Sequence, residues 1–496
     1  MPIELQAITD TGARLVASAE ELSGVLAAGA AEHDRDGTYP FEAIDALKGA
    51  GYFTAPIPLV LGGLGVSSAH DLVVASSRLA RGNASVAIGV NMHLVAVLNM
   101  ERRRQVAEAA GEARRARAFA ASLERIARDG VVLAAAISEP GQDLTRPRTR
   151  ATRTAAGWRI DGRKAFCTMV PAATDLYVAV TYADGDGVER YAYAMVPTGA
   201  AGAERRARAF GSSLAQIVRD GSVLAAAISE RGQDLTRPGT VATRTETGWR
   251  IDGRKVFCTM SPAATDLYVA VTYADAEGVE RYAYAMVPTG APGVVVNDDW
   301  DALGMRASGS HSVSLERVEL PASGVRGGFR AGEPVPYMER NLTAGLFHAS
   351  ASLGIAETAD AIARQGLAGR INGDARPRMQ VAENVVDLAA ARGVLARAAG
   401  LIDEHHRTHP ATDGTAAEVE ALFAEAQAAK AFVGEAATRI VDRALALSGG
   451  AGYLSGSPLA RAYRDVKAGS IMHPLGANRA YDYLGHIALG QAAEMH

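Results

Sequence analysis

Cysteine is nearly absent from this chain of 496 residues, which contains only Cys167 and Cys258. Two cysteines cannot build a disulfide framework or a zinc site, so we expect no metal. No apolar run approaches the length of a transmembrane helix without charges. The N-terminus also lacks the basic segment followed by an apolar segment that is typical of a secretory signal. We therefore expect a cytoplasmic protein that does not enter a membrane.

An excess of charge of either sign is also missing. The formal net charge is -4, so the sequence does not indicate a general affinity for nucleic acid or for an anionic membrane. Aromatic residues make up 6% of the chain, while 48% of the residues are apolar and 21% are charged, as in ordinary globular proteins. The length suggests roughly three domains.

The chain contains one long stretch twice. Residues 114–202 and 205–293 align at a constant offset of 91 residues, and 73 of the 89 paired positions are identical. The two cysteines are the same position in the two copies. Repeats of this length are usually domains or large fragments of domains. Each copy has the period-2 pattern of strands, and the single-copy segment 293–321 adds further strands. We expect one copy plus this segment to complete one β domain, and either copy could be the surplus one.

Helical periodicity flanks the repeated stretch on both sides. Apolar residues recur at helical spacing up to about residue 130 and again from about Pro334. The order helices, strands, helices predicts an α+β protein with three domains. We expect an N-terminal helical domain (1–130), a middle β-barrel or sandwich domain with the duplication (131–325), and a C-terminal four-helix bundle (326–496).

Four short motifs occur in the order and at the spacing of one known family. They are Ser138-Glu139-Pro140-Gly141, the strand Arg163 to Thr168, the run Gly449-Gly450-Ala451-Gly452-Tyr453, and Arg464-Asp465-Val466-Lys467. Together they make the chain resemble the acyl-CoA dehydrogenase family. The resemblance implies a flavin held between the β domain and the C-terminal helices, FAD rather than FMN, in a homo-oligomer (tetramer or dimer). The implied cofactor contacts are Ile137, Ser138, Gly141, Phe166 and Thr168 in the first copy, Ile228, Ser229, Phe257 and Thr259 in the second, and Gln380, Gly449 and Gly450.

The chain departs from the family pattern at the catalytic base. His473 stands where many members place a glutamate, and Glu339 matches a second family location for the base. Glu339 could instead be a carboxylate favoured at a helix start, and His473 could be a satisfied polar residue before Pro474. The resemblance also places Arg340, Arg306 and Ser308 near substrate, although an ion pair and a simple turn would explain them too.

Three functions are consistent with these residues. The first is α,β-dehydrogenation of an acyl thioester, with Glu339 as the base and hydride transfer to the flavin. The second is a flavin-dependent monooxygenase of the same fold, which uses reduced flavin and oxygen and needs a site closed to water. The third is a paralogue that has lost catalysis and acts as an interaction protein. The expected partners are a small-molecule substrate and either an electron-transfer protein or a flavin reductase.

Overall fold

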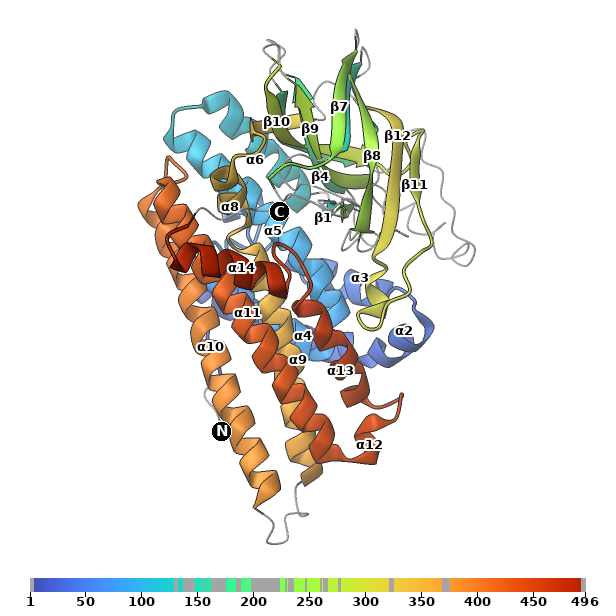
Figure 1. The fold of residues 1–496 in the computed structure, drawn as a ribbon, viewed down its shortest axis with the longest axis vertical. Helices are drawn as coiled ribbons and strands as arrows, with labels where there is room; N and C mark the ends of the chain where they lie inside the picture. Colours follow the sequence, from blue (N-terminus) through green and yellow to red (C-terminus); the bar gives the residue numbers. More distant parts are fainter. Residues whose placement is uncertain are drawn as a thin grey trace.

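A computed structural model shows three regions in the order that the sequence predicts (Figure 1). The N-terminal and C-terminal regions are helical, and the strands lie between them. The structure describes residues 4–128, 133–136, 148–154, 157–161, 175–183, 189–197, 224–227, 230, 236–245, 248–258, 261, 266–274, 278–320, 325–367 and 375–491.

The N-terminal region is organised around one buried helix, α5. Helix α5 is apolar nearly all round, as its sequence predicts, and its most apolar window is 94% buried although its length and composition would also suit a membrane span. Asn83 starts this helix by accepting hydrogen bonds from the backbone of Ser85 and Val86. The bounds in this region are α1 Asp10–Ala28, α2 Ala30–Asp36, α3 Phe41–Gly49, η1 Tyr52–Thr54, η2 Leu59–Leu61, α4 Ala69–Gly82, α5 Ala84–Ala109 and α6 Ala113–Arg128.

The strands of the second copy form one continuous structure with the single-copy strands. Strand β8 pairs antiparallel with β12 from Cys258–His311 to Trp249–Leu320, and β10 pairs with β13. Strand β12 also pairs with β11 on its other side. The second copy therefore completes the β domain. The bounds are β6 Leu224–Ala227, β7 Thr240–Thr245, β8 Gly248–Cys258, β9 Asp266–Ala274, β10 Glu280–Pro288, β11 Val294–Val296, η4 Arg306–Ser308, β12 His311–Leu320 and β13 Val325–Arg330.

The strands of the first copy join the same sheet through much shorter ladders. Their longest ladders are with each other: β4 pairs antiparallel with β5, and β2 pairs antiparallel with β3. Among the described residues, the first copy pairs with β12 at one ladder position, Arg153 with Leu320. The described residues form one 13-stranded sheet. The bounds are β1 Leu133–Ala136, β2 Arg148–Thr154, β3 Gly157–Asp161, β4 Asp175–Ala183 and β5 Glu189–Pro197.

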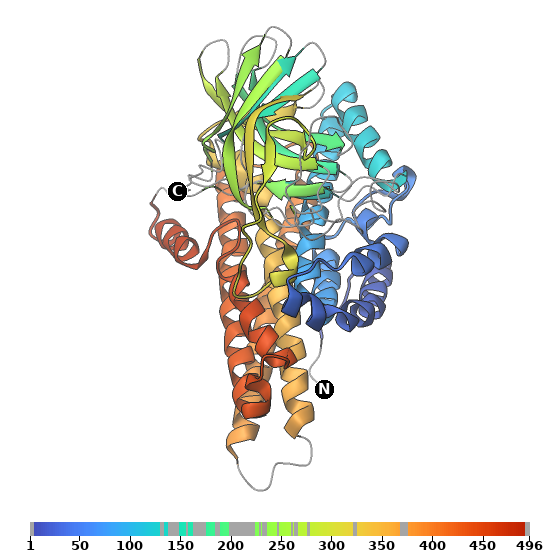
Figure 2. The ribbon, with the colours of Figure 1, turned by 90° about the vertical axis from the view of Figure 1, so that its right-hand side faces the viewer.

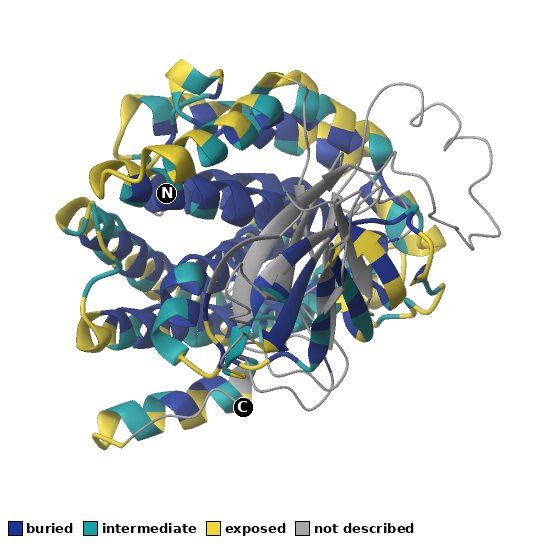
Figure 3. Cartoon of the chain, turned by 90° about the horizontal axis from the view of Figure 1, so that it is seen from above, coloured by how far each residue is buried: buried dark blue, intermediate teal, exposed yellow. Residues whose placement is uncertain are grey.

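The C-terminal helices form a long bundle, and the sheet lies at one end of it (Figures 1 and 2). Buried residues concentrate where this bundle meets the N-terminal helices (Figure 3). Helix α11 starts with a capping box in which Thr415 and Glu418 satisfy each other's backbone. The bounds are α8 Pro334–Asn341, α9 Ala344–Leu367, α10 Arg376–Thr408, α11 Ala416–Ser448, α12 Gly450–Tyr453, α13 Pro458–Gly469 and α14 Ala477–Ala488.

The family-like Arg464-Asp465 motif joins the three regions. The Arg464 guanidinium donates to both carboxylate oxygens of Asp34, at 3.0 and 2.6 Å. The buried Asp465 carboxylate accepts from the Met305 backbone N–H at 2.6 Å. Gly304 leaves no room for a Cβ, which would lie 2.4 Å from the Arg464 backbone. This motif therefore fixes the loop before β12 against α13 and α2.

Candidate active site

Helix α8 separates two buried polar clusters. Glu339 and Asn341 are two residues apart on this helix, so their side chains point to different sides. The first group, the Glu339 cluster, consists of Arg102, Arg103, Glu339, His405 and His406. The second, the His473 cluster, consists of Asn341, His348, Gln427, Lys430 and His473. The two candidate catalytic residues from the sequence thus lie in different environments.

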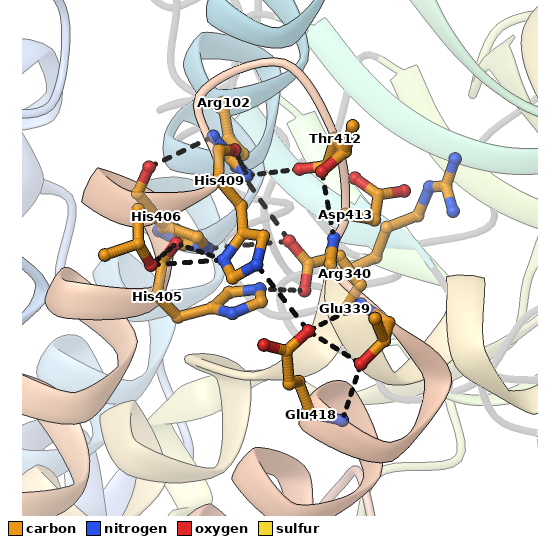
Figure 4. A network of polar contacts seen from close by, with 12 residues as sticks. Arg102, Glu339, Arg340, His405, His406, His409, Thr412, Asp413 and Glu418 are labelled. Carbon is orange, nitrogen blue, oxygen red and sulfur yellow. Dashed lines mark hydrogen bonds and ion pairs between the residues drawn. The ribbon is translucent and has the colours of Figure 1, made fainter.

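The Glu339 carboxylate is surrounded by cationic and imidazole groups (Figure 4). Its side chain is fully buried, and its Oε2 atom accepts from His405 Nε2 at 3.0 Å. Arg103, His406 and Arg102 approach Oε1 at 3.7, 3.7 and 3.9 Å. A buried carboxylate needs such partners. Burial and the neighbouring guanidinium groups hold the pKa of His406 well below its ordinary value.

The residues around Glu339 also fix the turn between α10 and α11. Arg102, on α5, donates to the backbone carbonyls of His409 and Thr412 at 2.6 and 2.8 Å, which satisfies the end of α10. Arg340 is held in the same region. Its guanidinium lies 4.6 Å from the centre of the Phe329 ring and donates to the Pro336 carbonyl at 2.7 Å. Arg102 and Arg340 therefore both make contacts that stabilise the fold.

The His473 cluster lies where α8, α9 and α11 meet the segment 470–476, which connects α13 to α14. Asn341 donates its amide N–H to the Tyr337 carbonyl at 2.8 Å, which turns its amide oxygen toward His473 Nε2 at 3.0 Å. His473 Nε2 then carries the proton, and the lone pair of the neutral ring lies on Nδ1. Burial, with His348 and Lys430 nearby, holds the pKa of His473 well below its ordinary value, so the ring is neutral near pH 7.

Two buried side chains of the His473 cluster have polar atoms without a partner among the described residues. They are both ring nitrogens of His348 and both amide atoms of Gln427. Burial lowers the pKa of His348 to about 3, so this ring is also neutral. A buried polar group without a partner is costly, and it indicates a bound ligand or water.

The predicted substrate residues Arg306 and Ser308 lie in the loop before β12. Arg306 donates from Nε to the Asp34 carbonyl at 3.0 Å, which anchors it to α2. Ser308 is buried, and its hydroxyl lies 2.7 Å from that of Ser310. Met305 and Gly309, on either side of this 3-10 turn, both have positive φ angles of 52°. The loop is thus a tightly fixed turn between the sheet and the helices.

The flavin-strand motif of the second copy lies on β8. Phe257 has a φ of +61°, which is strained for an aromatic residue, and its side chain is 43% exposed beside Trp300. Lys255, two residues earlier, is buried and donates to Glu230 Oε1 at 2.5 Å. Phe257 is therefore available to contact a flavin, while Lys255 supports the strand. The other strand candidates, Ile137, Ser138, Gly141, Phe166, Thr168, Ile228, Ser229 and Thr259, lie outside the described residues.

The remaining cofactor candidates lie at the opposite end of the bundle. Gly449 and Gly450 follow the end of α11, about 27 Å along that helix from Lys430. Gln380 lies near the same end, since the neighbouring Glu383 pairs with Arg443 of α11 at 2.8 Å. The structure thus does not bring these residues to the His473 cluster within one chain. Exposed apolar side chains surround this end: Met379, Tyr453 and Leu454.

Sequence reasoning missed four members of the His473 cluster. Asn341, His348, Gln427 and Lys430 carry no motif. A signal was present, however, because Gln427 and Lys430 interrupt the buried face of α11 between Phe423 and Val433. Polar residues in an apolar helical stripe are candidates for a site.

Comparison with known proteins places the chain beside one family. Residues 13–131, 225–318 and 328–478 match the models described as the N-terminal, middle and C-terminal domains of acyl-CoA dehydrogenase. The middle-domain match thus lies in the second copy and the single-copy strands.

Individual relatives match nearly the whole chain. The amino sugar nitrososynthase DnmZ of Streptomyces peucetius is 28% identical over 97% of this chain and 95% of its own. A solved nitrososynthase from Micromonospora carbonacea var. africana is 26% identical, with a TM-score of 0.71, over 99% of this chain and 100% of that chain. A KijD3 structure in complex with dTDP is 25% identical, with a TM-score of 0.72, over 98% of both chains.

Proposed function

This chain belongs to the acyl-CoA dehydrogenase family of flavin-dependent oxidoreductases, and from that premise we propose that it is a flavin-dependent monooxygenase acting on a small-molecule amine. The substrate class that we propose is an amino sugar, carried on a nucleotide. Membership of the family and the use of a flavin follow from the three domain matches. The monooxygenase reaction is the one that we propose among the activities of this family.

The observation that carries the proposal is the composition of the His473 cluster. It offers a neutral imidazole, an amide and a lysine, but no carboxylate, at the position where family dehydrogenases have their base. Removal of a proton from carbon needs a base of raised pKa at that position, whereas oxidation of an amine does not. The near-full-length similarity to nitrososynthases supports this choice.

The reaction consumes one amine, one O2 and two electrons. One oxygen atom enters the N–H bond to give a hydroxylamine, and the other leaves as water with two protons. When bound in reduced form, the flavin supplies the electrons that activate oxygen. We propose that His473 Nδ1 accepts the proton that the nitrogen loses, because the Asn341 amide oxygen accepts from Nε2 and so leaves the lone pair on Nδ1. The reaction also needs a site that is closed to water.

The proposed partners follow from this reaction. A flavin reductase or another electron donor must supply the reduced flavin. The flavin is FAD or FMN, which extraction and chromatography would distinguish. We also propose a cytoplasmic homo-oligomer, because the exposed Met379, Tyr453 and Leu454 lie beside the candidate cofactor residues Gln380, Gly449 and Gly450. A neighbouring copy could place that end of its bundle against the flavin.

Dehydrogenation of an acyl thioester is the second candidate, because Glu339 matches a family position for the base. A putative acyl-CoA dehydrogenase of Bacillus subtilis is also 26% identical over 90% of this chain. The contacts of Glu339 argue for a structural role, since His405 and two arginines already hold its carboxylate. Glu339 would need to leave these partners to reach a substrate carbon.

The test uses the purified protein with bound flavin. Under anaerobic conditions, a panel of acyl-CoA thioesters should leave the flavin absorbance unchanged. With a flavin reductase, NADH and oxygen, nucleotide-linked amino sugars should be converted to products heavier by one oxygen atom. Bleaching by an acyl-CoA would contradict the proposal and identify a dehydrogenase. A protein that takes up no flavin would identify the non-catalytic interaction protein.

A further inference from the structure

Lys430 is a fully buried lysine in the middle of α11 that contacts the segment beside His473. Its ammonium group donates to the backbone carbonyl of Met472 and, at 2.5 Å, to that of Leu475. These carbonyls lie on either side of the dipeptide His473-Pro474. Lys430 therefore holds both ends of the short segment that presents the imidazole.

The opposite side of the imidazole is fixed by a different helix. Asn341 of α8 accepts from His473 Nε2 at 3.0 Å, so the ring is held from one side while its backbone is held from the other. Gly345 of α9 leaves space for this arrangement. A Cβ at this position would lie 3.3 Å from Lys430 Cδ and 3.5 Å from Pro474 Cδ. Three helices thus position one loop.

A buried lysine destabilises a fold unless its ammonium group makes favourable interactions there. Burial lowers the pKa of Lys430 to about 7, because it removes the charged ammonium group from water. The helix bundle could be filled here by a methionine of similar length, without that cost. The ammonium group instead satisfies two carbonyls of an irregular segment, which an apolar side chain would leave without a donor.

We propose that Lys430 is a positioning residue, which clamps residues 472–475 and so fixes the His473 imidazole for the reaction. The consequence for catalysis rests on the proposed function, whereas the clamp itself does not. A displacement of about 1 Å at a reacting group can lower a rate by about a hundredfold. The clamp therefore affects turnover more than substrate affinity.

The test compares Lys430→Met with Lys430→Arg in the flavin-bound protein, and uses Lys467→Met on the neighbouring α13 as the matched control. Hydrogen–deuterium exchange should rise locally in peptides covering 470–477 of Lys430→Met. Its kcat should fall by at least about tenfold with little change in KM. Lys430→Arg keeps a cationic donor, so its exchange at 470–477 and its kcat should lie closer to those of the unmodified protein. Lys467→Met should change neither the exchange at 470–477 nor kcat. If Lys430→Met fails to fold, Lys430→Gln should show intermediate exchange in the same peptides.

Unchanged exchange at 470–477 in Lys430→Met would overturn the clamp. Exchange that rises equally throughout α9 and α11 would also overturn it, because it would identify Lys430 as a general packing residue. The variant His473→Ala separates this inference from the proposed function. If His473→Ala keeps full monooxygenase activity while Lys430→Met still loosens 470–477, the clamp stands and the role of His473 in the proposed reaction fails.

Discussion

At the scale of single residues, the two catalytic candidates differ in what surrounds them. Glu339 lies among guanidinium and imidazole groups that join α5, α8 and α10. His473 lies beside the Asn341 amide and near Lys430, and the neighbouring His348 and Gln427 have polar atoms without a partner among the described residues. The first arrangement surrounds a carboxylate with cationic groups, although Glu339 Oε1 has no hydrogen bond among the described residues, and the second contains no carboxylate. This difference supports the choice of His473 over Glu339 as the residue beside the reaction.

The variant Glu339→Gln distinguishes a structural role of Glu339 from a role as the catalytic base. Replacing the carboxylate by an amide removes the nearest buried counter-charge of Arg102 and leaves Arg103 with Asp413 alone, so we expect the free energy of unfolding to fall by about 3 kcal/mol. Oxidation of the amine should stay within a few-fold of the unmodified protein. Urea denaturation and steady-state rates measure the two effects. Loss of flavin reduction by acyl-CoA with unchanged stability would instead make Glu339 the base.

The buried histidines predict sensitivity to acid. The pKa of His348 is about 3 in the folded protein and about 6.5 when unfolded, so the unfolded chain binds more protons between these values. Stability present above pH 6.5 is therefore lost as the pH falls. We expect His348 to cost about 2 kcal/mol between pH 7 and pH 5.

Urea unfolding at several pH values measures this effect. The variant His348→Leu should lose that part of the pH dependence, while His486→Leu, at a half-exposed position on α14, should keep it. An identical pH dependence in His348→Leu and the unmodified protein would contradict the assignment.

At the scale of elements, the structure explains why two of the family-like motifs occur together. Glu230 belongs to the Ser-Glu-x-Gly turn of the second copy, and Lys255 belongs to its flavin strand. The Glu230 carboxylate accepts from Lys255 Nζ, from the Thr240 hydroxyl and from the backbone N–H of Gly239. The two motifs are therefore partners that hold β7 and β8 together, beneath the exposed Phe257.

A double-mutant cycle tests this pair. Lys255→Met leaves a buried carboxylate without its cation, and we expect it to lower the free energy of unfolding by about 3–5 kcal/mol. Adding Glu230→Gln removes that charge, so the double variant should be more stable than Lys255→Met alone. Urea denaturation of the three variants measures the coupling. Strictly additive effects would show that the pair does not act as a unit.

Much of the element order could be predicted from the sequence, because helical and strand periods are local signals. The helices up to about residue 130, the strands that follow them and the helices from about Pro334 all appear where these periods predict them. The His473 cluster could not be predicted, because α8, α9, α11 and the segment 470–476 contribute its residues, and Asn341 and His473 are 132 positions apart in sequence. The separation of Glu339 from His473 also depended on α8, which carries Glu339 on one side and Asn341, the partner of His473, on another.

At the scale of the whole molecule, the two copies contribute different parts. Helix α6 opens the first copy, and its Leu123 and Ile126 are buried in the N-terminal region. The strands that pair with β12 come mainly from the second copy. The family matches divide in the same way, with 13–131 ending in the first copy and 225–318 beginning in the second. The sequence showed the duplication, but the pairing partners of β12 were needed to choose between the copies.

Deleting residues 132–222 should therefore leave a working protein. This deletion removes one repeat period of 91 residues and joins α6 of the first copy to the strands of the second. We expect a folded chain that binds one flavin and keeps its activity. Deleting 224–314, also 91 residues, removes β6 to β11 and should prevent folding. Flavin stoichiometry and thermal unfolding measure both outcomes. Loss of the flavin site in the first deletion would show that the first copy holds the cofactor.

The central claim is that this protein transfers an oxygen atom from O2 to an amine nitrogen. The most direct measurement is the mass of the product formed from a nucleotide-linked amino sugar, reduced flavin and 18O2 in ordinary water. We predict that the product carries one 18O atom, and that none enters from 18O-labelled water under ordinary O2. An unsaturated acyl thioester formed without oxygen, or product oxygen derived only from water, would contradict the account.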